Sequence, residues 1–165
     1  MYTIISGTNR EGSNTLKVSK ILQQKLKDIN IEAPVFSLQE IDMLKRNEKF
    51  EQLEAQYLTP TQKFIFVIPE YNGSFPGVFK LMIDMSQIEK SWHHKKVLLF
   101  GVSSGRAGNL RGLDVLTNMC NYMKMHVYHQ KMPISLINNE LIDDEFVNNF
   151  TNETIEAILK NFTTY

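Results

Sequence analysis

The hydrophobic residues of the chain alternate between short continuous runs and longer segments in which they recur every three or four positions. Continuous runs rich in β-branched and aromatic residues predict strands, whereas the three- to four-residue spacing predicts helices with one apolar face. The strands are predicted over Tyr2 to Ser6, Ala33 to Leu38, Lys63 to Ile68 and Val97 to Val102, with short candidates at His126 to Tyr128 and Ile134 to Ile137.

Five helices are predicted between and after these strands. The clearest covers Asn14 to Asp28, where Val18, Ile21 and Leu22 begin an apolar stripe. Pro76 suits the first turn of another helix, because its φ is preset and its missing N–H is not needed there. The other helices are predicted over Glu48 to Tyr57, Pro76 to about Lys90, from about Asn109 along Leu113, Leu116, Cys120 and Met123, and over Asp143 to Phe162, whose first acids suit a helix N-terminus.

Strands that alternate with helices indicate βαβ units, in which parallel strands form one sheet with helices on both faces. The unbroken apolar character of Phe64 to Ile68 and Val97 to Val102 indicates central strands buried on both sides. We therefore predict an α/β, flavodoxin-like fold: a three-layer α/β/α sandwich around a five-stranded parallel sheet in the order 2-1-3-4-5. Ligands of such sheets bind beyond the carboxyl ends of the strands, so the polar loops after strands one, three and four should converge.

The composition of the chain argues against several classes of protein. The 165 residues fit a single domain, 1–165, and its 18 lysines and arginines balance its 18 aspartates and glutamates. The net charge of zero leaves no excess of positive charge with which to bind nucleic acid or an anionic membrane. The single cysteine, Cys120, leaves no internal disulfide and fits a reducing compartment. The chain shows no signal-peptide pattern and no membrane-length apolar stretch, so we expect a soluble, cytoplasmic protein.

The first polar loop, Ser6 to Thr15, combines two glycines, several hydroxyl side chains and Arg10. Backbone N–H groups at the start of a helix, together with hydroxyls, suit a phosphate group, and Arg10 can add a charge-assisted contact. The glycine spacing matches neither the Walker A loop nor the dinucleotide G-x-G-x-x-G pattern. The same residues also suit a capped helix that binds nothing, with Ser13 or Asn14 as the N-cap.

The second loop, Pro69 to Gly77, follows the strongest predicted strand. Its Asn72-Gly73 pair is typical of a tight turn, and a full hairpin is not expected because a helical pattern follows. As part of a binding site, Tyr71 would provide a wall for a flat ring, and Asn72, Gly73 and Ser74 would provide polar contacts.

The third loop, Ser103 to Asn109, also directly follows a buried strand. Its two serines, two glycines and Arg106 allow close approach to the edge of a ring, although a glycine-rich connection without a ligand explains them too. Each loop is ambiguous by itself. Because all three lie at predicted carboxyl ends of strands, together they favour one binding site.

The three loops resemble the signatures of the NADPH-dependent FMN reductase family, flavodoxin-like enzymes that include azo- and quinone reductases. Gly7 to Ser13, GTNREGS, resembles the family's G-S-x-R-x-x-S phosphate loop. Pro69 to Gly77, PEYNGSFPG, is close to its P-E-Y-N-G-S-x-P-G signature, the most specific of the three. Ser103 to Gly108, SSGRAG, resembles the S-x-G-x-x-G loop near the flavin ring. The resemblance spans residues 1 to about 128; Thr8 stands in place of a serine, and Ser104 where glycine is common.

The resemblance implies FMN as cofactor and NADPH or NADH as electron donor. It implies the FMN phosphate at Thr8, Arg10 and Ser13, with Asn14 or Thr15 as a further ligand. The flavin ring is expected against Pro69, Glu70, Tyr71, Asn72, Gly73 and Ser74, with Ser103, Ser104, Gly105 and Arg106 nearby.

A member of this family would pass hydride from NAD(P)H through bound FMN to a small-molecule acceptor such as a flavin, a quinone or an azo compound. The flavin performs the chemistry, so we nominate no side-chain acid or base. The resemblance also implies a homodimer or homotetramer, with the helix from Pro76 to Lys90 as a candidate contact. Two alternatives stay open: a non-enzymatic flavodoxin-like electron carrier, which the zero net charge disfavours, and a module that binds another phosphate-bearing ligand.

The remaining reactive side chains favour structural roles, and no metal site is predicted. His93 and His94 are adjacent, and in a strand they would point to opposite faces and not share a metal. No cysteine or acid cluster completes a site with His126 and His129. Cys120 lies on an apolar helical stripe and is interpreted as a small core residue.

Overall fold

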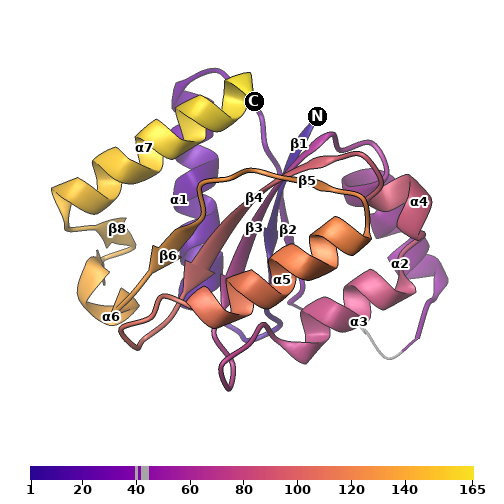
Figure 1. Ribbon diagram of the computed structural model, residues 1–165, viewed down its shortest axis with the longest axis horizontal. Helices are drawn as coiled ribbons and strands as arrows, with labels where there is room; N and C mark the ends of the chain where they lie inside the picture. Colours follow the sequence, from indigo (N-terminus) through magenta and orange to yellow (C-terminus); the bar gives the residue numbers. More distant parts are fainter. Residues whose placement is uncertain (40, 42–44) are drawn as a thin grey trace.

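A parallel sheet runs through the middle of the molecule (Figure 1). The computed structural model describes residues 1–39, 41 and 45–165. Its strands are β1 (Tyr2–Ser6), β2 (Val35–Ser37), β3 (Lys63–Pro69), β4 (Lys96–Val102), β5 (His126–Val127) and β6 (Met132–Ile134), with a separate antiparallel pair formed by β7 (Leu141–Ile142) and β8 (Glu145–Phe146). The main sheet has the order β2-β1-β3-β4-β5, and β6 also pairs with β4.

This topology confirms the predicted flavodoxin-like fold and its strand order. The prediction of five strands was wrong in one respect, because two short strands share the fifth position. β5 pairs with the beginning of β4, where Lys96 lies opposite His126, and β6 pairs with its end, where Phe100 lies opposite Met132. The strand expected over Ile134 to Ile137 accordingly lies earlier in the chain.

Helices cover both faces of the sheet. They are α1 (Asn14–Asp28), α2 (Glu48–Leu53), the π-helix η1 (Glu54–Leu58), α3 (Gly77–Met85), α4 (Ile88–Ser91), α5 (Leu110–Tyr122), α6 (Ile137–Glu140) and α7 (Asn149–Thr164). Figure 1 shows α1 and α7 on one face and α3 and α5 on the other. The predicted bounds of α1 are confirmed, and the helix predicted over Glu48 to Tyr57 is α2 continued by η1. Within the described ranges, no helix is long and apolar enough to cross a membrane.

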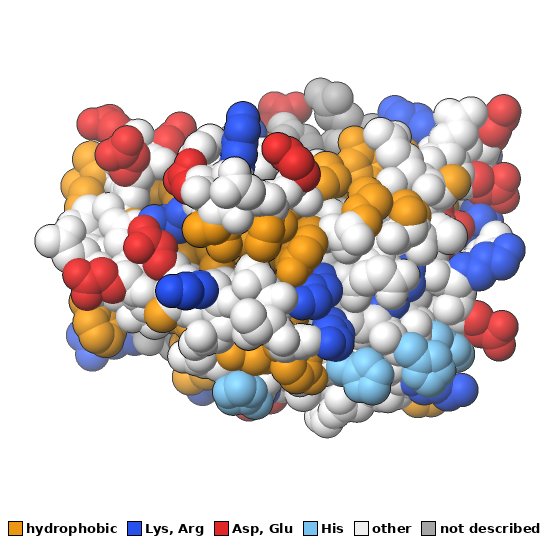
Figure 2. All heavy atoms as spheres, turned by 90° about the horizontal axis from the view of Figure 1, so that it is seen from above, with side chains coloured by type: hydrophobic (Ala, Val, Ile, Leu, Met, Phe, Trp, Pro, Cys, Tyr) orange, Lys and Arg blue, Asp and Glu red, His pale blue; other side chains and the backbone are white. Residues whose placement is uncertain are grey.

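Figure 2 looks onto the edge of the sheet where the strands begin, and histidine side chains gather on one side of this face. The ring of His94 lies 5.9 Å from that of His93 and 6.4 Å from that of His126. His93 and His94 are in a turn, not in a strand, and His94 has a positive φ of 61°. Among the residues that the structure describes, no group of three histidine, cysteine or acidic side chains could hold a metal ion. These histidines lie at the opposite end of the strands from the three polar loops.

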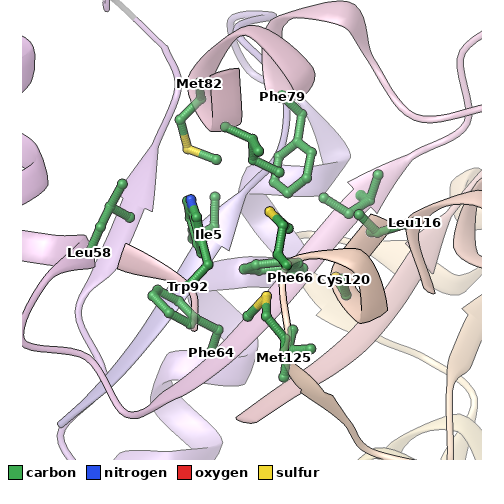
Figure 3. Close-up of a cluster of buried hydrophobic side chains, with 14 of the residues drawn as sticks. Ile5, Leu58, Phe64, Phe66, Phe79, Met82, Trp92, Leu116, Cys120 and Met125 are labelled. Carbon is green, nitrogen blue, oxygen red and sulfur yellow. The ribbon is translucent and has the colours of Figure 1, made fainter. Parts of the chain in front are cut away.

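The alternating side chains of the central strands form a core on each face of the sheet. Phe64 and Phe66 pack with Trp92 and Phe79 on the side of α3 and α5, with ring centroids of Phe64 and Trp92 5.1 Å apart (Figure 3). Cys120 lies in the same cluster, and burial raises the pKa of its thiol to about 12, which fits its interpretation as a core residue. Ile65 and Val67 point to the other face, toward α1 and α7. Such two-sided burial explains the unbroken apolar runs in the sequence.

The helix predicted from Pro76 to about Lys90 is interrupted after Met85. Ser86 is extended, with ψ of 158°, and its hydroxyl oxygen accepts a hydrogen bond from the indole N–H of fully buried Trp92. The next N–H, that of Gln87, donates to the buried carboxylate of Glu54. The chain changes direction between α3 and α4, where Ser86 and Gln87 form hydrogen bonds with the buried side chains of Trp92 and Glu54. Pro76 precedes the first helical residue as the N-cap instead of lying within the first turn.

The Glu54 carboxylate joins η1 to this interruption. It accepts a hydrogen bond from Ser91 at 2.8 Å and forms a salt bridge with Arg46 at 2.6 Å. Arg46 also donates a hydrogen bond to the Met85 carbonyl. Burial alone would raise the pKa of Glu54, but hydrogen bonds from Gln87, Arg46 and Ser91 outweigh it and hold the pKa below its ordinary value. The network therefore stabilises the ionised carboxylate inside the protein.

The last predicted helix begins later than expected. Asp143 and Asp144, interpreted as acids at a helix N-terminus, both have positive φ and form the turn between β7 and β8. Aspartate tolerates the left-handed region better than most residues, so this pair suits a two-residue hairpin turn. The helix starts at Asn149, and the side chain of Asn148 caps it by accepting from the Phe150 N–H.

Candidate functional site

The three polar loops meet at one edge of the sheet because their strands end in register. Ser6 of β1 lies opposite Val67 of β3, and Pro69 at the end of β3 lies opposite Val102 of β4. Two backbone hydrogen bonds continue the ladder beyond the strands, from the Gly7 N–H to the Val67 carbonyl and from the Glu70 N–H to the Val102 carbonyl, both 2.9 Å. The loops are thus held side by side by the sheet itself.

A pocket of about 370 Å³ lies between these loops. Its volume is within the range of about 300–1,000 Å³ that is typical of small-molecule sites. The lining comprises Arg10, Glu11, Gly12, Ser13, Asn14 and Thr15 from the first loop, Pro69, Glu70 and Tyr71 from the second, Val102, Ser103 and Ser104 from the third, and Ile137 and Asn138. The structure therefore brings together residues of all three predicted loops.

Some of the predicted site residues lie outside this lining. Thr8 is almost fully buried, and its hydroxyl lies 2.7 Å from the hydroxyl of Tyr71. It therefore connects the first loop to the second. The other predicted residues that do not line the pocket are Asn72, Gly73, Ser74, Gly105 and Arg106.

The first loop leads into α1 through Ser13. The Ser13 side chain accepts a hydrogen bond from the Leu16 N–H at 3.2 Å, so Ser13 is the N-cap and not Asn14. The Asn14 amide donates to the side-chain oxygen of Asn138 at 2.9 Å. The Thr15 side chain is 2% exposed and makes no hydrogen bond within the part of the chain that the structure describes, although it lines the pocket. Of the two alternatives left by the sequence, Thr15 has the unengaged hydroxyl.

Tyr71 is held from two sides by the first loop. Besides the hydroxyl contact with Thr8, the guanidinium of Arg10 lies over the Tyr71 ring, 4.9 Å from its centroid. This distance is typical of a cation–π contact. The ring position is thus fixed by its hydroxyl at one end and by a cation on one face.

The Asn72-Gly73 pair forms the predicted tight turn. Both residues have positive φ, 53° and 77°, as a type I′ turn requires. The backbone groups of Tyr71 and Ser74 exchange two hydrogen bonds across it, at 2.8 and 3.1 Å. The turn is a minimal hairpin that leads directly to α3 without a second strand, and it fixes the orientation of Tyr71 at its base.

The third loop is anchored at its far end by Asn109. This residue is fully buried in the left-handed conformation, φ 66°, and its side-chain amide donates to the Ile68 carbonyl at 3.0 Å. Nearer the pocket, the Ser103 hydroxyl donates to the Gly105 carbonyl at 2.9 Å. Asn109 therefore connects the end of the third loop with the strand that leads into the second.

Sequence reasoning missed the contribution of a fourth segment. Ile137 and Asn138 line the pocket from the start of α6, far from the three motifs. The segment carries no glycine-rich or hydroxyl-rich pattern that would indicate a ligand. Its position depends on pairing between β6 and β4, which the short run around Ile134 did not reveal.

A larger hollow, of about 760 Å³, lies between α1 and the β7–β8 pair. Its charged side chains include ion pairs between Lys17 and Asp144, at 2.6 Å, and between Lys25 and Glu156, at 2.7 Å. These four charged groups are already engaged with one another within the protein. The smaller pocket at the strand ends has the chemistry of a site.

The residues of that smaller pocket fit FMN. Its α1 end offers the helix N-terminus, the Ser13 and Thr15 hydroxyls and Arg10, and no acid lies in the first turn of α1. Donors without a neighbouring acid in that turn suit a phosphate group. The other end is bordered by Pro69 to Tyr71 and by Ser103 and Ser104, which provide backbone groups and hydroxyls for the edge of a ring.

Comparison with solved structures reveals similar folds over nearly the whole chain. FerB from Paracoccus denitrificans, described as a flavoenzyme NAD(P)H:(acceptor) oxidoreductase, is 20% identical with a TM-score of 0.79, covering 99% of this chain and 95% of its own. An FMN-dependent NADH-azoreductase from Bacillus anthracis, solved with FMN, is 12% identical with a TM-score of 0.63 and coverage of 98% and 99%. A flavodoxin from the domain Archaea is 11% identical, also with a TM-score of 0.63, and coverage is 98% and 95%. At these identities the likeness shows the fold.

Sequence comparison identifies the family. No curated protein matches the chain by sequence. The model of the NADPH-dependent FMN reductase family matches residues 2–137, which include all three loops and most of the sheet. This match agrees with the loop signatures and with a pocket whose donors fit FMN. The chain belongs to the NADPH-dependent FMN reductase family, whose members are oxidoreductases that use FMN with NAD(P)H as donor.

Proposed function

We propose that the protein reduces a small-molecule acceptor, such as a flavin, a quinone or an azo compound, with electrons from NADPH or NADH. The observation that carries the proposal is the pocket at the ends of β1, β3 and β4, where the unengaged hydroxyl of Thr15 lies beside the N-terminus of α1. This hydroxyl lines the pocket and makes no hydrogen bond within the described residues, so it is available to donate to a ligand. A phosphate at this point would satisfy it.

The residues divide the pocket into two ends. Arg10, Ser13 and Thr15 would hold the phosphate of FMN, and the helix N-terminus favours its negative charge. Pro69, Glu70 and Tyr71 would border one side of the flavin ring, with Ser103 and Ser104 at its edge. Because Thr8 bonds to Tyr71, we revise its expected role from phosphate ligand to support for the ring wall. The turn at Asn72 to Ser74 would likewise support Tyr71, whose backbone exchanges two hydrogen bonds with that of Ser74.

When bound, FMN supplies the hydride and electron chemistry. The side chains bind and orient, and none is assigned a proton-transfer role. The open side of the pocket would admit the nicotinamide donor and then the acceptor in turn. We further propose that the protein acts in the cytoplasm, in agreement with its single cysteine, and that it forms a homodimer or homotetramer, as the family resemblance implies.

The test begins with purified protein. The flavin released by heating should have the absorption spectrum of FMN, and the protein reconstituted with FMN should oxidise NADPH or NADH when a quinone or an azo dye is present. A colourless protein that leaves NADPH oxidation unaccelerated after addition of FMN would refute the proposal. Flavin that binds but is reduced only by a separate reductase would indicate an electron carrier.

The Thr15→Val variant tests the phosphate end. Valine has nearly the same shape as threonine but lacks the hydroxyl, and a hydrogen bond to a charged group contributes about 1.5–3 kcal/mol. We expect FMN to bind roughly 10- to 100-fold more weakly. Thr154→Val, in α7 and outside the pocket lining, is the matched control and should bind FMN like the wild type. Equal FMN affinity of Thr15→Val and the control would contradict the assignment.

A further inference from the structure

A fourth loop, between β6 and α6, is fastened to the third loop by backbone hydrogen bonds. The Ser103 N–H donates to the Ile134 carbonyl and the Ile137 N–H donates to the Ser103 carbonyl, both at 3.0 Å. The Leu136 N–H donates to the Gly105 carbonyl at 2.9 Å. Leu136 has a positive φ of 50°, which is unfavourable for a large side chain and persists only where surrounding contacts hold it. The position of the next residues is therefore fixed by the third loop.

Asn138 connects this fourth loop to the first. Its side-chain oxygen accepts the hydrogen bond from the Asn14 amide at 2.9 Å, across 124 positions of sequence. The contact lies beside Ser13 and Thr15, at the end of the pocket where α1 begins. The fourth loop thus connects the first loop to the third at this end of the pocket.

The chemistry of Asn138 leaves donors available. A side-chain amide has one acceptor oxygen and two N–H donors. The oxygen is occupied by Asn14, whereas the amide nitrogen makes no hydrogen bond within the described residues. Asn138 is exposed and lines the pocket. The acidic side chain nearest in sequence, Glu140, is engaged away from the pocket by Thr151 and Asn148.

We propose that Asn138 is a further cofactor-binding residue, which donates from its amide nitrogen to the phosphate of FMN while its oxygen holds Asn14 in place. This inference rests on the proposed function, since it assumes that FMN binds in this pocket. Asn138 lies one residue beyond the segment that the family model matches, 2–137. The phosphate end of the site is then completed by a residue outside the three loop motifs.

The test compares two flavins, FMN and riboflavin, which lacks the phosphate. Their dissociation constants are measured by quenching of flavin fluorescence for the wild type, Asn138→Ala, Asn138→Asp and Asn139→Ala. The control residue Asn139 is the exposed neighbour outside the lining, and its backbone hydrogen bond to Leu136 does not need its side chain. Urea unfolding of each variant establishes that the fold is retained.

We expect Asn138→Ala to weaken FMN binding about 10- to 100-fold and to leave riboflavin binding unchanged, because the lost bond reaches a charged group. Asn138→Asp keeps an oxygen for Asn14 but brings a negative charge to the phosphate, so it should bind FMN more weakly than Asn138→Ala. Asn139→Ala should match the wild type with both flavins.

Three results would overturn the inference: unchanged FMN affinity in Asn138→Ala, an equal loss for FMN and riboflavin, or wild-type FMN affinity in Asn138→Asp. The last would mean that Asn138 only positions Asn14. Failure of the proposed function is recognised separately in the wild type, which would then either bind neither flavin or bind FMN without being reduced by NADPH or NADH.

Discussion

Asn109 should be one of the most sensitive positions in the scaffold of the site. Its side chain is fully buried, and the amide donates to the Ile68 carbonyl at the point where β3 approaches the second loop. Its backbone has a φ of 66° at the end of the third loop. Replacing Asn109 by alanine removes the hydrogen bond and also places a less tolerant residue in the left-handed region, whereas replacing it by glycine removes only the hydrogen bond.

These two contributions can be estimated separately. Loss of a buried donor costs about 1–3 kcal/mol when the acceptor is left without a partner. A left-handed backbone costs an ordinary L-residue about 1–2 kcal/mol. The Asn109 oxygen is buried without a hydrogen-bond partner among the described residues, so removing it relieves an existing cost and offsets part of the loss from the broken hydrogen bond. We expect Asn109→Ala to lower the free energy of unfolding by about 2–4 kcal/mol and Asn109→Gly by about 1–3 kcal/mol.

Urea unfolding provides the assay, with fluorescence of Trp92 as the probe. Trp92 is the only tryptophan of the chain and is fully buried, so its emission reports loss of the core. With a slope of about 1–3 kcal/mol/M, the midpoint of Asn109→Ala should fall by about 1 M or more. Asn118→Ala, on the exposed side of α5, is the control and should change stability by less than about 0.5 kcal/mol. An Asn109→Ala variant as stable as Asn118→Ala would contradict these estimates, and so would an Asn109→Gly variant less stable than Asn109→Ala.

Substitutions at Thr8, Glu54 and Gly108 test three other interactions in the structure. Thr8→Val and Tyr71→Phe should each destabilise the protein by about 1 kcal/mol, and the double variant should lose less than the sum, as a double-mutant cycle by urea unfolding would show; full additivity would mean that the two hydroxyls do not interact. The lowered pKa of Glu54 means that its carboxylate stabilises the fold above the unfolded pKa of about 4.3 and that this contribution is lost as pH falls through the folded value. Glu54→Gln should therefore differ from the wild type most near neutral pH and least in acid, and a difference that is constant across pH would contradict this. Gly108→Ala should lower the thermal unfolding temperature more than Gly12→Ala. Both glycines have positive φ, but only at Gly108, of these two, would a Cβ lie 2.7 Å from other atoms. Equal decreases in the two variants would show that the crowded contact at Gly108 relaxes without cost.

Hydrophobic pattern predicted the parts of the fold that depend on long, regular burial. The strand Tyr2–Ser6 and the helix Asn14–Asp28 have the predicted bounds. A continuous apolar run indicates a buried strand, and a helical stripe indicates a helix with one buried face. The end of the chain was predicted less well. Asp143 and Asp144 suit both a helix start and a hairpin turn, and only the pairing of β7 with β8 selects the turn.

The site was predictable to the extent that its chemistry lies in loops with glycine and hydroxyl residues. The first, second and third loops line one pocket because adjacent parallel strands end at the same edge. The contact of Thr8 with Tyr71 could not be predicted, because a hydroxyl looks the same in sequence whether or not it bonds to another side chain. Asn138 was missed because its place depends on non-local contacts with Ser103 and Gly105 through its neighbours.

The division of the fifth strand position has a consequence for how the protein behaves in a crowded solution. A long edge strand exposes a row of backbone groups with which another chain can pair, and this leads to aggregation. Here the edge opposite β2 is divided into β5, two residues long, and β6, three residues long, and β6 contains Pro133, which has no N–H to donate. β2 at the other edge has only three residues, whereas the seven-residue strands β3 and β4 lie inside the sheet. The most apolar strands are thus shielded from intermolecular pairing on both sides.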